Sequence, residues 1–255
     1  MQYQATQPGL FPPTIDGLSL PEGSVLKFPD GTETDLWIST SGMRVAEADV
    51  LQEGSVRLFA TTGLWPVMVD PEDTRDFDEI CLEGASITIP ESFDVSAYFH
   101  RRAQDELSSS DLDRKLAKVL KDFDPDRPGP FEPSSPDEVT YIIGQDFVHF
   151  GLAKCTRPAD IPAAIGWAGA ANYDLDGGQM SMILRSWEDR FGVLLSGLGR
   201  ETMSLSVQHL SPSSQLQLAA ELYLVCPDVV EQGVGSFGAL QKFLRSMHGA
   251  LLWWD

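Results

Sequence analysis

Hydrophobic positions recur with helical spacing in six segments of the chain. In residues 179–192, Met182, Ile183 and Trp187 lie at helical spacing, and Gly192 follows as a typical helix stop. Apolar residues with similar spacing predict five further helices, at 94–107, 108–123, 159–167, 213–226 and 236–247.

Short runs rich in β-branched and aromatic residues predict strands between these helices. The predicted strands are 24–28, 35–39, 55–60, 61–70, 85–90, 139–144, 147–155, 193–198, 203–207 and 250–255. Pro66 interrupts one of them, and because proline cannot donate to a ladder, we expect an edge strand or a kinked strand there. Helices alternate with hairpins rather than with single parallel strands. We therefore expect an α+β fold, with an antiparallel or mixed sheet covered by helices.

Prolines suggest where the chain divides. Residues 124–138 contain five prolines, which is typical of a linker. This places an acidic N-terminal α+β region at 1–123 and a C-terminal α+β domain at 139–255.

The net charge of −20 is unevenly spread. Residues 1–150 hold 28 acidic and 11 basic side chains, which gives −17, and residues 151–255 carry the remaining −3. Such a field disfavours nucleic acid, whose binding depends on Lys and Arg. It favours a basic protein partner, and solubility alone is the other explanation that stays open.

Three features that the sequence lacks bear on the cellular compartment of the protein. No apolar run approaches the ~20 residues of a membrane span, and the first residues lack a secretory pattern. The three cysteines, Cys81, Cys155 and Cys226, form no CxxC pair. We therefore expect a cytoplasmic protein with buried, inert thiols and no membrane contact.

Metal and acid–base chemistry find little support in the spacing of the side chains. The acidic residues of 71–80 lack the EF-hand pattern, and the histidines show no ligand spacing, so we expect no metal and no cofactor. Glu188 and Asp189 are adjacent in a predicted helix and point about 100° apart, so they are not a general acid–base pair. Pairs between Glu188 and Arg190 are expected to be solvated and of little energetic weight.

The segment LVCPDVVEQGVGS, residues 224–236, contains the most distinctive candidate site. Cys226 ends a predicted helix, where the helix dipole favours the neutral thiol over the thiolate, so a structural thiol is favoured over a nucleophile. Gly233 and Gly235 lead into a helix start, which is a general anion site. Ser236 as a simple N-cap accounts for the same residues.

Several motifs together resemble the bacterial family known as domain of unknown function 4253. They are TGLWPV (62–67), GWAGAANY (166–173), residues 184–207, residues 223–236 and the terminal WWD (253–255). The resemblance implies no established activity. In one departure from the pattern, Arg200–Glu201 stand where an aromatic is expected.

The resemblance also implies that these motifs converge in space to form a ligand-binding site. Adjacent residues of a strand point to opposite faces, so one of Trp253 and Trp254 is expected to be exposed or to cover a groove. The candidate ligand-binding residues are Trp65, Cys226, Asp228, Gly233, Gly235, Ser236, Trp254 and Asp255.

Three functions remain open at the level of sequence. The leading hypothesis is a binding or interaction protein, such as an inhibitor or immunity-type partner of a basic protein. The second is a small-ligand-binding protein or enzyme whose site lies near the Cys226–Ser236 turn and the terminal Trp-Trp-Asp. The third is an accessory module of a larger assembly. No recognisable catalytic constellation supports an enzyme.

Overall fold

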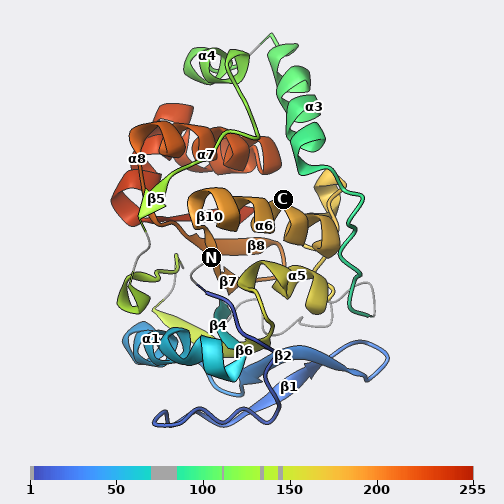
Figure 1. Ribbon diagram of the computed structural model, residues 1–255, viewed down its shortest axis with the longest axis vertical. Helices are drawn as coiled ribbons and strands as arrows, with labels where there is room; N and C mark the ends of the chain where they lie inside the picture. Colours follow the sequence, from blue (N-terminus) through green and yellow to red (C-terminus); the bar gives the residue numbers. More distant parts are fainter. Residues whose placement is uncertain (1–2, 70–84, 111, 133–134, 143–145, 255) are drawn as a thin grey trace.

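The computed structural model describes residues 3–69, 85–110, 112–132, 135–142 and 146–254. Its central element is an eight-stranded sheet in the order β1-β2-β6-β4-β7-β8-β10, in which β3 also pairs with β6 (Figure 1). The strands are β1 (Gly23–Lys27), β2 (Glu33–Ser39), β3 (Met43–Arg44), β4 (Leu64–Val69), β6 (Phe147–Lys154), β7 (Leu194–Leu198), β8 (Thr202–Ser206) and β10 (Gly249–Trp253). Among the strands of the described residues, the β4–β7 pair is the one parallel pair. The expected α+β fold with a mixed sheet is confirmed.

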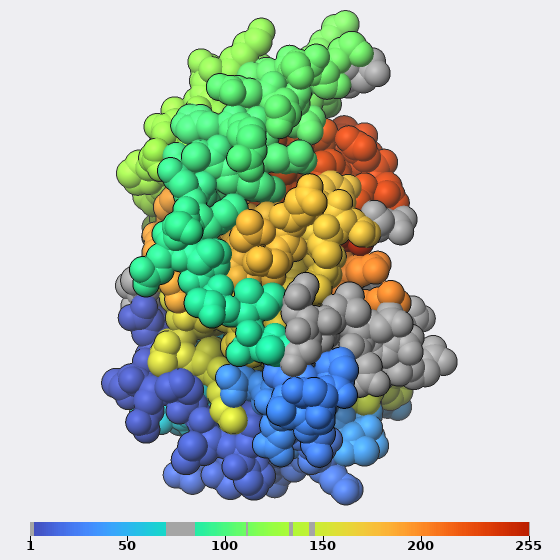
Figure 2. Space-filling view, turned by 90° about the vertical axis from the view of Figure 1, so that its right-hand side faces the viewer, coloured from blue at the N-terminus to red at the C-terminus, as the bar shows by residue number. Residues whose placement is uncertain are grey.

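Most of the helices lie in the upper half of Figure 1 and a few in its lower half. The longer helices are α1 (Val45–Thr62), α3 (Val95–Leu107), α4 (Arg114–Lys121), α6 (Gly177–Phe191), α7 (Pro212–Val225) and α8 (Phe237–Met247). The shorter ones are η2 (Pro136–Glu138), η3 (Pro158–Asp160), α5 (Ile161–Ala164), η4 (Ala171–Tyr173) and the π-helix η5 (Val229–Val234). Helices α3 and α4 form one end of the molecule, and β1 and β2 lie at the opposite end (Figure 2).

Local capping accounts for the helix boundaries that the sequence predicts. The Asp176 side chain accepts a hydrogen bond from the backbone N–H of Gln179 and forms a capping box at the start of α6. Gly192 ends this helix with φ of 65°, in the left-handed region that glycine tolerates best. The Ser236 side chain accepts a hydrogen bond from the backbone N–H of Ala239 and caps the start of α8. The predicted cap at Ser236 and the predicted stop at Gly192 are confirmed, whereas the cap at Asp176 starts α6 two residues before the predicted helix.

Strand β4 lies in the interior of the sheet, so the prediction of an edge strand at Pro66 is wrong. All six of its residues are buried, and alternate residues face two separate parts of the core. Pro66 is opposite Leu152 of β6. On the other side, β4 pairs with β7 only between Met68 and Gly197, so the missing N–H of Pro66 interrupts no ladder contact there.

The predicted strand at 55–60 is also wrong, because these residues belong to α1. The buried side chains of α1 are Ala48, Gln52, Ser55, Val56 and Phe59, whose spacing is helical over the whole element. A six-residue window rich in apolar residues hides this longer period. Residues 85–90 and the described part of 139–144 form no strand either, and a short β5 (Phe131–Glu132) pairs with β9 (His209–Leu210).

The sheet takes strands from both sides of the proline-rich segment 124–138. β2 and β4 precede that segment, and both pair with β6, which follows it. The division into an N-terminal region at 1–123 and a C-terminal domain at 139–255 stays a prediction. Within the described ranges, no helix combines the length and the apolar character needed to cross a membrane.

Candidate functional site

Cys226 closes α7 and is fully buried. Its Sγ donates a hydrogen bond to the backbone oxygen of Trp253 at 2.9 Å. Burial is the largest cause that raises the pKa of this thiol, to about 12. At neutral pH the sulfur is therefore a protonated, poorly nucleophilic thiol, which favours the structural interpretation.

The carboxylate of Asp228 connects two short helices. One oxygen accepts a hydrogen bond from Tyr173 Oη at 2.7 Å, and the other accepts from Gln232 Nε2 at 3.0 Å. Burial, followed by the hydrogen bond and charge of Asp228, raises the pKa of Tyr173. Each oxygen of Asp228 thus already has a partner, and this arrangement fits a structural link between η4 and η5 better than a general base.

The two glycines of the 224–236 segment serve different purposes. A Cβ on Gly233 would collide with the ring of Trp253, so this position must be small for the terminal strand to pack. Gly235 has φ of 78° and ends η5 in the left-handed conformation. The Ser236 hydroxyl accepts from Ala239 N at 3.2 Å, so a side chain already occupies one donor of the predicted anion site.

The candidate tryptophans are core residues rather than surface groups. Trp254 is fully buried, its Nε1 donates to Val225 O at 3.1 Å, and its ring meets Trp167 edge to face. Trp65 is equally buried, and its Nε1 donates to Leu195 O at 2.6 Å.

The structure therefore brings part of the predicted site together. Direct contacts join Cys226 and Gly233 to Trp253, and Val225 to Trp254. Trp65 lies elsewhere in the core, where it contacts Tyr3, Phe59 and Leu195. Asp255 lies outside the described residues. The role of this cluster in ligand binding stays a prediction.

An acidic cavity of about 240 Å³ opens beside this cluster, and we call it the α3 cavity. Gly235 and Ser236 line it together with three carboxylates, on Glu106, Asp113 and Glu231. Tyr223 Oη lies 3.3 Å from a Glu106 oxygen and 3.2 Å from a Glu231 oxygen. The outward side of the predicted site is thus negatively charged, which makes it a poor cradle for an anion.

A larger acidic cavity of about 520 Å³, the α1 cavity, lies between α1 on one side and residues 136–141 and Asp146 on the other. Its wall carries four carboxylates, on Asp49, Glu53, Asp137 and Asp146. Burial, followed by the charge of Asp49, raises the pKa of Tyr141 in the same wall. Sequence reasoning missed this cavity because the two segments that form it are far apart in the chain.

Two features of the α1 cavity concern hydrogen bonding and charge balance. Gln52 is 3% exposed, and its Nε2 has no hydrogen-bond partner among the described residues. Arg57 forms ion pairs with Glu53 at 2.6 Å and with Asp137 at 3.7 Å. One cation therefore accompanies four carboxylates, and the cavity keeps an excess of negative charge.

Two buried ion pairs correct the expectation that the charges of 186–191 are solvated. Arg190 binds Glu221 of α7 through two nitrogens, at 2.6 and 2.9 Å, and Glu221 is fully buried. Glu188 is also buried and accepts a hydrogen bond from Arg157 Nε at 2.8 Å. The error arose because the partners come from other elements, which the sequence of α6 does not reveal.

The burial of Glu188 leads us to expect that the free energy of unfolding depends on pH in a specific way. Burial raises its pKa from 4.5 to about 7, although Arg157 acts in the opposite direction. Between pH 4.5 and about pH 7, the folded protein therefore binds more protons at this group than the unfolded chain does. The stability that this group contributes is complete below about pH 4.5 and is lost as the pH rises through 7.

We therefore expect the stability of the wild type relative to Glu188→Gln to fall by up to about 3 kcal/mol between pH 4.5 and 7.5. Urea denaturation at a series of pH values measures it. Asp189→Asn is the matched control, because Asp189 binds the same Arg157 but is 44% exposed. A difference between wild type and Glu188→Gln that stayed constant with pH would contradict the raised pKa.

Within the described ranges, no group of three or more His, Cys, Asp or Glu side chains is arranged to hold a metal ion. The acidic residues of 71–80, considered for a cation in the sequence, lie outside these ranges.

A comparison with known protein families finds a match in the C-terminal part of the chain. Residues 149–255 match the family described as a domain of unknown function, DUF4253. The motifs at 166–173, 184–207 and 223–236 fall within this range, so the resemblance noted from them is confirmed. No curated protein and no solved structure matches the chain.

Proposed function

We propose that this chain, whose residues 149–255 match the DUF4253 family, is a bacterial cytoplasmic binding protein for a basic protein partner. The observation that carries the proposal is the α1 cavity with its four carboxylates. It belongs to the part of the chain before the family match, where most of the negative charge resides. The free thiols of Cys155 and Cys226 fit a reducing compartment.

The chemistry of the α1 cavity suits a protruding Lys or Arg side chain. Charge-assisted hydrogen bonds from a guanidinium or ammonium group to Asp49 and Asp146 would neutralise carboxylates that Arg57 does not contact.

The wider charge distribution supports rapid encounter with such a partner. The −17 carried by residues 1–150 extends the attraction beyond the cavity itself. An inhibitor or immunity-type protein benefits from this attraction, because its toxic or catalytic target must be bound quickly. The attraction weakens as salt screens it over distances of about 10 Å at 0.1 M ionic strength.

The decisive experiment measures binding of an oligo-arginine peptide by isothermal titration calorimetry. We expect Asp49→Asn/Asp146→Asn to weaken binding by roughly tenfold, because both carboxylates line the α1 cavity. Raising the salt concentration from about 0.05 to 0.3 M should also weaken binding of the peptide to the wild type, because salt screens the attraction between their charges.

The matched control is Glu91→Gln/Asp105→Asn, which removes the same charge from exposed positions that do not line the α1 cavity. Its affinity should remain within about twofold of the wild type. If both pairs of substitutions weakened binding equally, only the net charge would matter, and the cavity would not be the binding site.

A further inference from the structure

Helix α4 has a charge opposite to that of the whole chain. Four of its eight residues are basic, Arg114, Lys115, Lys118 and Lys121, and none is acidic. Its apolar residues Leu116 and Leu120 are buried against the rest of the protein. The helix therefore presents a compact basic surface on a protein of net charge −20.

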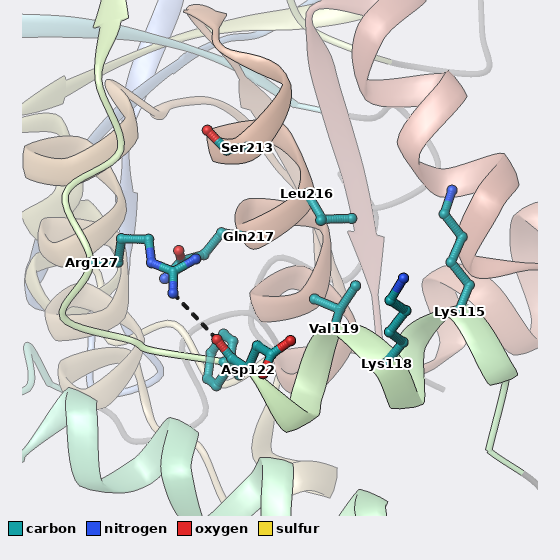
Figure 3. Close-up of a pocket in the computed structure, with 9 residues that line it drawn as sticks. Lys115, Lys118, Val119, Asp122, Arg127, Ser213, Leu216 and Gln217 are labelled. Atoms are coloured by element: carbon teal, nitrogen blue, oxygen red, sulfur yellow. Dashed lines mark hydrogen bonds between the residues drawn. The ribbon is translucent and has the colours of Figure 1, made fainter.

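A cavity of about 380 Å³, the α4 cavity, lies between α4 and α7 (Figure 3). Lys115, Lys118 and Arg127 bring three cationic groups to it. Its other lining residues are the apolar Val119, Phe123 and Leu216, the polar Ser213 and Gln217, and the acidic Asp122. Cationic and apolar groups thus line the same small volume, which falls within the usual range for ligand pockets, about 300–1,000 Å³.

The three cationic groups are not neutralised by carboxylates. Within the described residues, none of them forms an ion pair. Lys115 Nζ donates to the amide oxygen of Gln241, and Arg127 Nη2 makes a long hydrogen bond of 3.4 Å to the backbone oxygen of Asp122, drawn in Figure 3. In a chain with 38 acidic residues, three cations around one cavity without a paired carboxylate leave a local excess of positive charge.

The start of α7 adds to this positive potential. Ser213 lies in the first turn of this 14-residue helix, where the helix dipole favours anions. In Figure 3 the Ser213 and Gln217 side chains come from α7, and Arg127 comes from the segment facing it. A head group lying between these elements would meet donors from both sides.

We propose that the α4 cavity binds a small anionic amphiphile, that is, a carboxylate or phosphate head group joined to an apolar body. The head group is bound by Arg127 beside the start of α7, and the apolar body packs against Val119, Phe123 and Leu216. Lys118 lies on the other side of Val119 and adds positive charge to the cavity (Figure 3). A polyanion such as nucleic acid is disfavoured, because the charge of −20 repels it over its whole length. A small anion carries one or two charges, so the local cations outweigh that repulsion.

The test uses two fluorescent probes of similar shape, 8-anilino-1-naphthalenesulfonate and its uncharged counterpart N-phenyl-1-naphthylamine. We expect the sulfonate to bind at one site and at least about tenfold more tightly than the neutral probe. Lys118→Gln/Arg127→Gln should weaken sulfonate binding by at least about tenfold, because it removes two cations of the cavity. Circular dichroism and thermal melting establish that each variant is folded.

Arg114→Gln/Lys121→Gln is the matched control, because it removes the same charge from α4 at positions that do not line the cavity. It should change the affinity by less than about twofold. Asp122→Asn changes the charge of the cavity in the opposite direction, because it removes the carboxylate that lines the cavity among the described residues. It should therefore strengthen sulfonate binding by a few-fold. Equal effects of the two double substitutions, or equal affinity for both probes, would overturn the proposal.

Competition then identifies the head group. Octyl phosphate and octanoate should displace the sulfonate probe, and the stronger competitor shows whether the natural ligand carries a phosphate or a carboxylate. Inorganic phosphate at the same concentration should displace little, because it lacks the apolar body. If inorganic phosphate competed as well as octyl phosphate, the apolar wall would contribute nothing and the amphiphile would be the wrong class of ligand.

Discussion

Replacing Arg190 by Met is expected to lower the free energy of unfolding at pH 7 by about 3–5 kcal/mol. The substitution leaves the carboxylate of Glu221, which is fully buried, without the two guanidinium hydrogen bonds at 2.6 and 2.9 Å. Trp187 Nε1 and Gln217 Nε2 still donate to that carboxylate, but neither brings a positive charge. Chemical denaturation followed by tryptophan fluorescence measures the loss.

The double substitution Arg190→Met/Glu221→Gln is the informative control. It removes both charges together and keeps an amide oxygen that can accept from Trp187 Nε1, so most of the loss should be recovered. Burial already raises the pKa of Glu221, so the loss caused by Arg190→Met alone should also shrink at low pH, where the carboxyl is neutral. A double variant as unstable as the single one would show that packing by Arg190, rather than its charge, matters.

Trp254→Ala is expected to cost about 3–5 kcal/mol of stability. The indole is fully buried, it meets Trp167 edge to face at a centroid distance of 5.3 Å, and it donates to Val225 O. Its removal leaves a large cavity between the terminal strand and α7. Urea denaturation measures the effect.

Trp253→Ala serves as the neighbouring comparison. Trp253 is only partly buried, so its loss should cost less, about 1–2 kcal/mol. If Trp254→Ala kept the stability of the wild type, Trp254 would not be a core residue, and its predicted role as a ligand-binding residue would gain support.

The sequence by itself determined the elements whose boundaries depend on nearby residues. The start of α8 follows from Ser236, because this cap acts on a backbone N–H three residues away. The cap at Asp176 acts over the same short distance, although the sequence analysis did not single it out. The stop at Gly192 and the hairpin of β7 and β8 likewise depend on short-range geometry. The resemblance to the DUF4253 family could also be found from sequence alone, since it follows from the residues of local motifs.

Part of the candidate site was also predictable from sequence. The 224–236 turn meets the terminal strand, as the convergence of motifs implied, through the contact of Cys226 with Trp253. The burial of Trp254 and the separate location of Trp65 were not predictable, because an aromatic side chain in a strand faces the core or the solvent according to what packs over it.

Only the tertiary structure decided the environment of the charged residues. Glu188 and Arg190 look solvated in their own helix, but the chain places Arg157 and Glu221 against them from other elements. The α1 cavity likewise forms because Asp49 and Asp146, far apart in sequence, face one volume. Local spacing specifies where a helix begins and ends. The free energy of a charge depends instead on the groups and the water around it, and these are set only when distant segments pack together.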